Sequence, residues 1–153
     1  RGNITVVDCL ALICSVIAVI VSIVTYFLGQ KENNRLNQLT LEAEYFSDIY
    51  KKYLIKDIPN ARRFIQFVDT RLTGTGEMIK LLDELLQDSY YYMYKDPTFF
   101  EKVKIHSQKL SDYLALCSGR NYVGEEQTEV LTEIKSLLAE LYSCITNHLI
   151  GLN

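Results

Sequence analysis

Proline and glycine are scarce in this chain, with 2 and 7 copies respectively among 153 residues. Leucine, lysine, glutamate and tyrosine are plentiful instead, and this mixture favours helix over sheet. Internal repeats and low-complexity segments are absent too. A chain of this length has room for one membrane segment and one small domain of roughly 120 residues. The composition therefore predicts an all-α fold.

The chain also lacks an excess of positive charge. Its 16 lysines and arginines are outnumbered by 19 aspartates and glutamates, which gives a formal net charge of −3. Domains that bind nucleic acid through electrostatics usually carry a basic face. We therefore expect no direct nucleic-acid partner.

Sequence signatures of metal, cofactor and nucleophile sites are missing as well. The cysteines form no CxxC pair and HExxH is absent, so zinc and thioredoxin-type chemistry have no support. Gly74 and Gly76 follow no predicted strand and precede no Lys-Ser/Thr pair, so they indicate a turn and not a phosphate-binding loop. We expect no cofactor and no metal. Four reduced thiols are expected to act as small buried hydrophobes, as in the cytosol: Cys9, Cys14, Cys117 and Cys144.

The two histidines are weak candidates for catalysis. His106 lies among lysines on a charged stretch, which favours a solvated surface position. His148, next to Asn147 near the end of the last predicted helix, has no Asp, Glu or second His spaced to activate it. A cationic His148 would instead interact favourably with the helix C-terminus. We therefore expect a structural His148 and no enzymatic activity.

What the chain does have is a nearly unbroken apolar run over residues 6–28. About 20 apolar residues span the hydrocarbon of a bilayer as a helix, so the run predicts a transmembrane helix over 4–30. It is longer than the apolar part of a cleaved signal peptide and no A-x-A-like site follows it, so we expect a retained signal-anchor. We also expect the natural start to lie upstream of Arg1. Lys31 and Arg35 follow the run closely, which predicts a single-pass protein of the cell membrane with its C-terminal domain in the cytoplasm.

Small and polar residues inside this run recur with heptad spacing. Ala, Ser, Thr and Gly on one helix face allow the backbones of neighbouring helices to approach closely. An ionisable residue at the end of that face is expected to face a bundle interior or water. In a dimer the face would make a dry contact, whereas in a ring of many copies it would line a narrow polar channel. The predicted pore or self-association seam consists of Asp8, Ala11, Ser15, Ala18, Ser22, Thr25 and Gly29.

The heptad continues beyond the apolar run, and no Gly or Pro interrupts residues 31–58. We predict that this segment is a cytosolic extension of the same helix and that Pro59 ends it. Two interpretations stay open, a coiled coil with partner copies or an amphipathic helix that packs on its own domain. The continuing positions are Leu36, Ala43 and Tyr50 on one seam and Glu32, Leu39, Phe46 and Tyr53 on the other.

Residues 59–153 predict a bundle of about four helices with short connections, so that neighbours are largely antiparallel. The expected helices cover 61–72, 77–94, 97–118 and 125–150. The expected caps are Thr75 and Asp96 at helix starts, with Pro97 in the first turn, Gly119 as a left-handed C-cap, and Gly151 after the last helix.

Aromatic side chains gather in the stretch from residue 90 to residue 100. Such a cluster can stack on a ligand or base, but tyrosines more often fill a bundle end or an oligomer contact. We expect packing or an interface for Tyr90, Tyr91, Tyr92, Tyr94, Phe99 and Phe100.

A single N-terminal membrane helix that leads into a small helical bundle, with His148 late on the last helix, resembles the accessory membrane proteins of type VI-B CRISPR systems. That resemblance implies a divergent HEPN-like helical domain and assembly into a membrane pore that strengthens RNA-guided antiphage defence. The HEPN ribonuclease pattern pairs an Arg with a His after four to six intervening residues. His148 matches the His position and Asn147 its polar neighbourhood, but Leu141, Tyr142 and Ser143 stand where the Arg would be. The resemblance therefore implies a pore without ribonuclease activity.

The leading hypothesis is a homo-oligomeric, single-pass membrane protein that forms a pore or membrane lesion as an antiphage-defence effector or CRISPR accessory protein. Its partners would be further copies of itself, the lipid bilayer and an RNA-guided effector protein. A second hypothesis is a membrane-tethered adaptor or sensor that binds a protein through its bundle, with the long helix as a dimeric stalk. A third is a membrane-anchored HEPN-type ribonuclease. The number of protomers separates the first two, and replacement of His148 tests the third.

Overall fold

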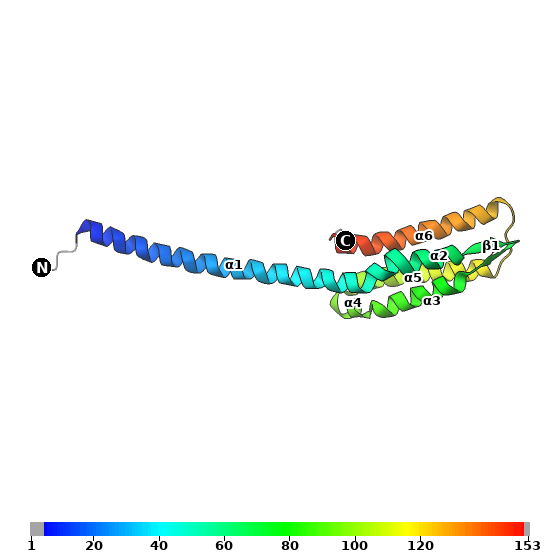
Figure 1. Ribbon diagram of the computed structural model, residues 1–153, viewed down its shortest axis with the longest axis horizontal. Helices are drawn as coiled ribbons and strands as arrows, with labels where there is room; N and C mark the ends of the chain where they lie inside the picture. The colour runs from blue at the N-terminus through cyan, green and yellow to red at the C-terminus, as the bar shows by residue number, and fades with distance from the viewer. Residues whose placement is uncertain (1–4, 152–153) are drawn as a thin grey trace. The chain divides into compact units, whose positions relative to one another are not determined.

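A computed structural model describes residues 5–151, apart from the side chains at positions 39 and 40. The chain divides into two compact units, Arg1–Ala43 and Glu44–Asn153, and each is described by itself. Helix α1 (Val6–Lys52) supplies the first unit and the start of the second, which contains every other element (Figure 1). The described residues are mostly helical, as predicted.

The first unit is a helical segment without a core of its own. The described side chains at positions 6–38 and 41–43 are all exposed. This segment belongs to the one helix of the described residues that is long and apolar enough to cross a membrane. None of its most apolar window is buried, so it does not serve as the core helix of the bundle. Over residues 6–30 the predicted transmembrane helix therefore coincides with a helical, apolar and fully exposed segment, and residue 4 of the predicted span lies outside the described residues.

The second unit begins with the last turns of α1, and these pack on the bundle. Phe46, Tyr50 and Tyr53 are buried. The Tyr50 hydroxyl donates a hydrogen bond to Ser89 Oγ at 2.9 Å, and the Ser89 hydroxyl donates to the carbonyl of Leu85 at 2.7 Å. Burial raises the pKa of Tyr50. Of the two interpretations of the continuing heptad, packing on its own domain is thus the correct one for these three aromatic positions.

Pro59 does not end the helical path, contrary to the sequence prediction. A π-helical turn, η1 (Tyr53–Asp57), follows α1, and Pro59 lies in the first turn of the next helix, α2 (Ile58–Phe64). Proline is compatible with this position because its ring fixes a φ that suits the first turn of a helix. The predicted extension over 31–58 is therefore helical throughout, with a π-helical turn at residues 53–57.

The predicted helix over 61–72 is wrong beyond Phe64. Ile65 adopts an extended conformation, and strands β1 (Gln66–Val68) and β2 (Arg71–Thr73) form an antiparallel hairpin. Aromatic and β-branched residues dominate β1, and such residues favour strands. Asp69 turns the chain with a positive φ of 55°, a conformation that Asp tolerates better than most residues. The all-α prediction must therefore include one short hairpin.

Gly74 is required at the end of this hairpin. Its φ is +75°, and an added Cβ would lie 1.8 Å from the carbonyl oxygen of Phe64. A strand thus does precede Gly74, although the sequence predicted none. Gly74, and not Thr75, is the residue before α3 (Thr75–Asp88), so the predicted Thr75 cap is wrong.

The predicted helix over 77–94 is two helices. Helix α3 ends at Asp88, and α4 (Tyr90–Lys95) begins after Ser89. The buried Ser89 hydroxyl bonds to the carbonyl of Leu85, and serine in this role bends or interrupts helices. The apolar face of α3 is confirmed, since Met78, Leu82 and Leu85 are buried.

The last two helices agree with the prediction. Helix α5 (Pro97–Ser118) begins with the Asp96 side chain accepting a hydrogen bond from the Phe99 amide at 3.2 Å. Gly119 is not a left-handed cap, because its φ is −90°. Helix α6 (Glu125–Leu149) follows, and Gly151 has a positive φ of 73° just beyond it.

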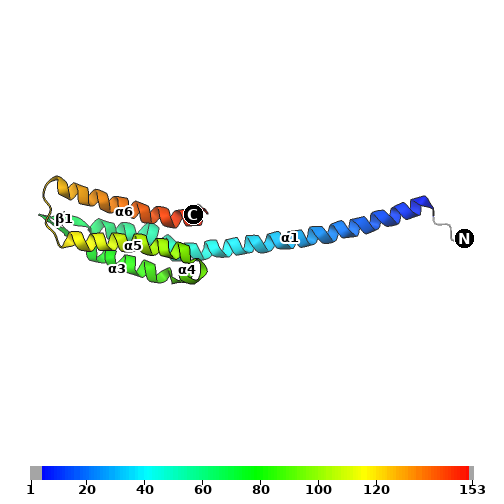
Figure 2. The ribbon, with the colours of Figure 1, turned by 180° about the vertical axis from the view of Figure 1, so that it is seen from behind.

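Helices α5 and α6 run side by side, and the loop between them lies at the hairpin end of the bundle (Figure 2). There the amide of Tyr122 donates to the carbonyl of Thr70 at 2.8 Å. The core draws on every helix of the unit and on β2. Its fully buried large side chains include Tyr50, Phe99, Ile58, Met78, Leu82, Leu85, Leu110, Leu114, Ile134, Leu141, Ile145 and Val103.

Candidate functional sites: an apolar helix face and a polar groove

The predicted seam of α1 lies on one face of the helix. At 100° per residue its seven positions fall within a sector of about 100°. Each hydroxyl on it donates to the carbonyl four residues before: Ser15 to Ala11 at 2.9 Å, Ser22 to Ala18 at 2.8 Å, and Thr25 to Val21 at 2.8 Å. Since these hydroxyls are satisfied within the helix, the face is small and effectively apolar. Gly29 has open space around the position of an added Cβ.

Asp8 has a local role that the sequence analysis missed. Its carboxylate accepts hydrogen bonds from the Thr5 hydroxyl at 2.8 Å and the Thr5 amide at 3.3 Å. The Asp8 amide donates in return to Thr5 Oγ1 at 3.2 Å. This reciprocal pattern is a capping box, in which an acidic residue stands three positions after a Thr. Asp8 therefore stabilises the start of α1.

The cysteines divide between the two units. Cys117 is buried and Cys144 is half-buried, as predicted, and burial raises the pKa of the Cys144 thiol. Cys9 and Cys14 are exposed, so their predicted burial is wrong within the fold of one chain. The reason is that the apolar segment has no packing partner in its own unit.

His148 is packed among aromatic rings. Its imidazole stacks on Phe99 with ring centres 3.8 Å apart and also contacts Phe46 and Tyr92. Its Nδ1 lies 3.8 Å from a carboxylate oxygen of Asp96, which the chain brings from the start of α5. Asp96 is the acidic neighbour that sequence spacing did not reveal. The side chain is 18% exposed, and this setting favours a structural role.

Leu141, Tyr142 and Ser143 occupy the positions of the HEPN arginine, and each has a different surrounding in this structure. Leu141 is fully buried, and the Tyr142 hydroxyl donates to the carbonyl of Leu54 at 2.6 Å. Ser143 lines a groove on a different side of α6 from the buried Leu141.

The aromatic cluster around α4 is partly core and partly surface. Tyr92, Phe99 and Phe100 are buried, which confirms packing for these three. Tyr91 stacks on Tyr45 at 5.3 Å but remains partly exposed. The remaining two tyrosines lie at the surface, and Tyr94 is 83% exposed.

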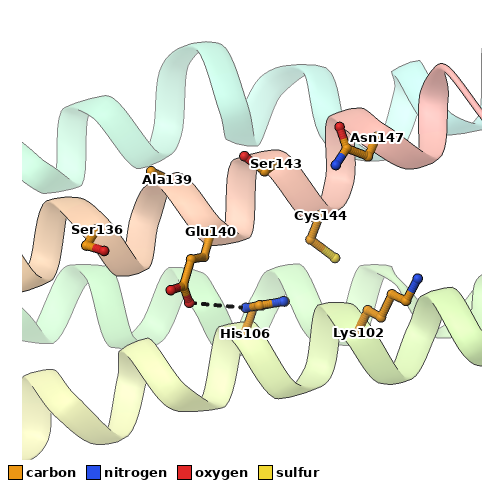
Figure 3. A pocket seen from close by; sticks show the side chains of 8 residues that line it. All are labelled: Lys102, His106, Ser136, Ala139, Glu140, Ser143, Cys144 and Asn147. Atoms are coloured by element: carbon orange, nitrogen blue, oxygen red, sulfur yellow. Dashed lines mark ion pairs between the residues drawn. The ribbon is translucent and has the colours of Figure 1, made fainter. Parts of the chain in front are cut away.

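A polar groove of about 460 Å³ lies between α5 and α6. Figure 3 shows Glu140 and Cys144 extending from α6 toward α5, and His106 and Lys102 rising from α5 to meet them. The full lining consists of Lys102, His106, Ser136, Ala139, Glu140, Ser143, Cys144 and Asn147. The sequence did not predict this groove, because its two walls lie about 40 positions apart in the chain.

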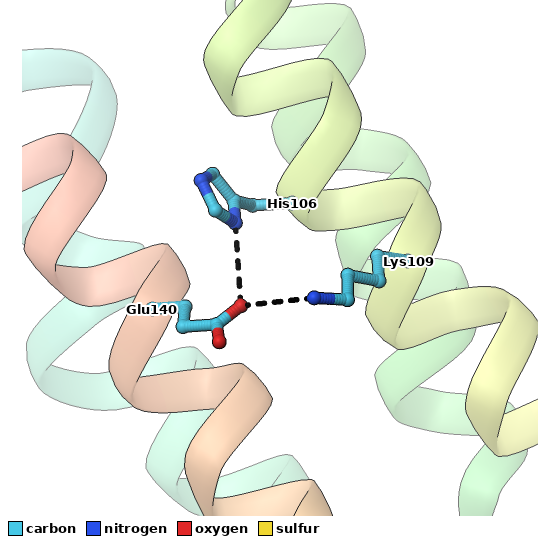
Figure 4. Close-up of polar contacts among 3 residues, drawn as sticks. All are labelled: His106, Lys109 and Glu140. Atoms are coloured by element: carbon cyan, nitrogen blue, oxygen red, sulfur yellow. Dashed lines mark hydrogen bonds and ion pairs between the residues drawn. The ribbon is translucent and has the colours of Figure 1, made fainter.

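One carboxylate in the groove faces two basic side chains. Glu140 Oε2 lies 3.4 Å from Lys109 Nζ and 3.7 Å from His106 Nδ1 (Figure 4). His106 is only 29% exposed, so the predicted solvated position is wrong. The reason is that His106 lies on the side of α5 that faces α6. Its buried Nδ1 makes no hydrogen bond within the described part of the chain.

Among residues 5–151, no three His, Cys, Asp or Glu side chains converge as a set of metal ligands. No protein-family model, curated protein or solved structure matches this chain. The resemblance to the CRISPR accessory proteins therefore stays an expectation drawn from the layout of the chain.

Proposed function

We propose that this protein is a single-pass membrane protein that self-associates through the seam of α1 and forms a pore or lesion in the bilayer. The observation that carries the proposal is that the Ser and Thr hydroxyls of the seam bond to carbonyls of their own helix. A face of small residues with no unsatisfied hydroxyl can lie in hydrocarbon and pack closely against its own copy.

The seam is better suited than the other faces of the apolar segment to form the contact between helices. Lipid provides no hydrophobic drive for helix association, so the attraction must come from close van der Waals packing. Small side chains at Ala11, Ser15, Ala18 and Ser22 permit that approach, whereas Val, Ile and Leu cover the remainder. The side chains of the whole segment are exposed, so no part of its own fold competes for this face.

The bundle is then the cytoplasmic part of the protein. Lys31 and Arg35 follow the apolar segment and support that orientation through the positive-inside rule. A defence setting, in which an RNA-guided partner activates the protein, is what the resemblance implies for such a lesion.

The test is membrane depolarisation in cells that express the chain. Replacing Ser15, Ser22 and Gly29 together with Leu should abolish depolarisation, because bulky side chains separate the backbones. The matched control replaces Ile13, Ile20 and Val24 with Leu on the opposite face of the helix and should retain it. Equal depolarisation by both triple variants at equal expression would remove the seam from the mechanism.

A membrane-tethered adaptor is the second candidate, and the exposed tyrosines of α4 favour it. Tyrosine is enriched in protein interfaces, and Tyr94 is 83% exposed. The oligomeric state in detergent, measured by mass photometry, separates the two candidates. A ring of many protomers supports the pore, and a dimer supports the adaptor.

A further inference from the structure

The groove between α5 and α6 has two ends of different character. Toward the C-terminal end of α6 it presents Lys102, Cys144 and Asn147, and toward the other end it presents Ser136 and Glu140 (Figure 3). The imidazole of His106 stands between the two ends. The groove is therefore rich in hydrogen-bonding groups along its whole length.

The two ends of the groove differ in whether their charged side chains have a partner of opposite charge. Glu140 is flanked by Lys109 and His106, at 3.4 Å and 3.7 Å. No acid of residues 5–151 lies within ion-pair distance of Lys102. The Lys102 end thus holds a cation without a counter-charge, beside the neutral amide of Asn147.

His106 is oriented so that it can join these two groups. Its Nδ1 faces Glu140, which leaves Nε2 directed toward the Lys102 end (Figure 3). In the protonated imidazole both nitrogens are donors. One N–H would then face the Glu140 carboxylate and the other would face the groove.

We propose that the Lys102 end of this groove binds the oxyanion group, phosphate or carboxylate, of a small polar ligand. The Lys102 ammonium supplies the positive charge, and the Asn147 amide and the His106 Nε2–H donate hydrogen bonds. Lysine serves as a point-charge partner for such groups, and hydrogen bonds to an ionised acceptor are among the strong ones. A volume of about 460 Å³ is that of a small-molecule site.

Binding of the oxyanion and protonation of His106 reinforce each other. The charged groups that face this imidazole are Lys102 and Lys109 from α5 and Glu140 from α6, with the Cys144 thiol beside them.

The experiment is an NMR titration of the full chain in lipid nanodiscs with inorganic phosphate and, separately, with acetate. The signals to follow are the His106 imidazole and the Asn147 side-chain amide. We expect saturable shifts with an affinity on the order of millimolar for at least one probe, as suits a fragment-sized ligand. The probe with the stronger effect identifies phosphate or carboxylate as the preferred group.

Variants inside and outside the groove distinguish binding at this site from a general attraction of the anion to the positive charges of the protein. Lys102→Gln and His106→Gln should each weaken binding about tenfold, as expected for one charge-assisted hydrogen bond. Lys104→Ala removes the same charge as Lys102→Gln from the same helix, outside the groove, and should leave the affinity within about twofold. A wild-type protein without saturable shifts, or equal weakening by Lys104→Ala, would each overturn the proposal. The membrane function is not involved in any of these readouts.

Discussion

The hydroxyl of Tyr142 on α6 donates a hydrogen bond to the carbonyl of Leu54 in η1, at 2.6 Å. At the end of this π-helical turn the amide of Ile58 bonds to the carbonyl of Tyr53, five residues back. The same pattern would pair residue 59 with Leu54, but Pro59 has no N–H. Tyr142 thus supplies the donor that proline cannot, and it connects the π-helical turn to the last helix.

Replacing Tyr142 with Phe should destabilise the bundle by about 1–2 kcal/mol, because the Leu54 carbonyl loses its partner in a partly buried place. Denaturant unfolding of the chain in detergent, followed by the signal of the bundle, measures the change. Tyr94→Phe is the matched control and should stay within about 0.5 kcal/mol, since Tyr94 lies at the surface.

Pro59→Ala should partly restore the stability of Tyr142→Phe, because the new amide can donate to Leu54. In the wild-type background the same substitution brings no such gain, as Tyr142 already occupies that carbonyl. If Pro59→Ala acts alike in both backgrounds, the two residues do not share the acceptor.

The stability of the bundle should fall as the pH rises above about 10, the ordinary pKa of tyrosine. Burial raises the pKa of Tyr50 in the folded protein, so folding favours the neutral hydroxyl. The contribution of Tyr50 to the free energy of unfolding is fully present below the pKa of tyrosine in the unfolded chain. It is lost as the pH rises toward the pKa of Tyr50 in the folded protein. Unfolding midpoints measured between pH 8 and 11 should therefore decline less steeply in Tyr50→Phe than in the wild type. An unchanged slope would mean that Tyr50 does not ionise on unfolding in this range.

His148→Phe keeps a flat ring that can stack on Phe99 but loses the contact with Asp96, so it should cost the bundle no more than about 1 kcal/mol and preserve depolarisation. His148→Ala should destabilise the bundle by about 2–4 kcal/mol through the space it leaves among the aromatic rings. Thermal unfolding and the depolarisation assay are the measurements. Loss of depolarisation in a stable His148→Phe protein would instead indicate a chemical role for the imidazole.

Gly74→Ala should destabilise the bundle by more than about 2 kcal/mol, since the added Cβ collides with the Phe64 carbonyl and the backbone has a positive φ. Gly76→Ala is the matched control two residues away. Nothing lies within 4 Å of a Cβ added there, and alanine favours a helix, so the stability should rise by up to about 1 kcal/mol. Equal thermal midpoints for the two variants would contradict this account of the hairpin exit.

Helices α5 and α6 could be predicted because their signals are local. Asp96 and Pro97 mark the start of α5, and regularly spaced apolar residues run along α6. The hairpin was missed because Phe64, Ile65, Phe67, Val68 and Leu72 follow a helical period, and this pattern favours a helix over a strand. Only the packing of β2 on the bundle and the turn at residue 69 decide between them.

The polar sites could not be predicted, because each joins residues that are distant in the chain. His148 meets Asp96 across 52 positions, and Glu140 meets His106 across 34. Spacing rules along one helix cannot detect such pairs. The Thr5–Asp8 capping box is different, since its three-residue spacing was visible in the sequence and was simply assigned another role.

The hydrogen bonds of the seam hydroxyls on α1 affect the concentration at which copies of the protein would assemble. Because Ser15, Ser22 and Thr25 are already bonded within their own helix, these three hydroxyls need no partner on a neighbouring helix. A single chain can therefore remain a monomer in the bilayer, and its concentration there would determine when it assembles. For the proposed pore, membrane damage should then rise steeply with copy number, with none at low abundance and an abrupt onset above a threshold.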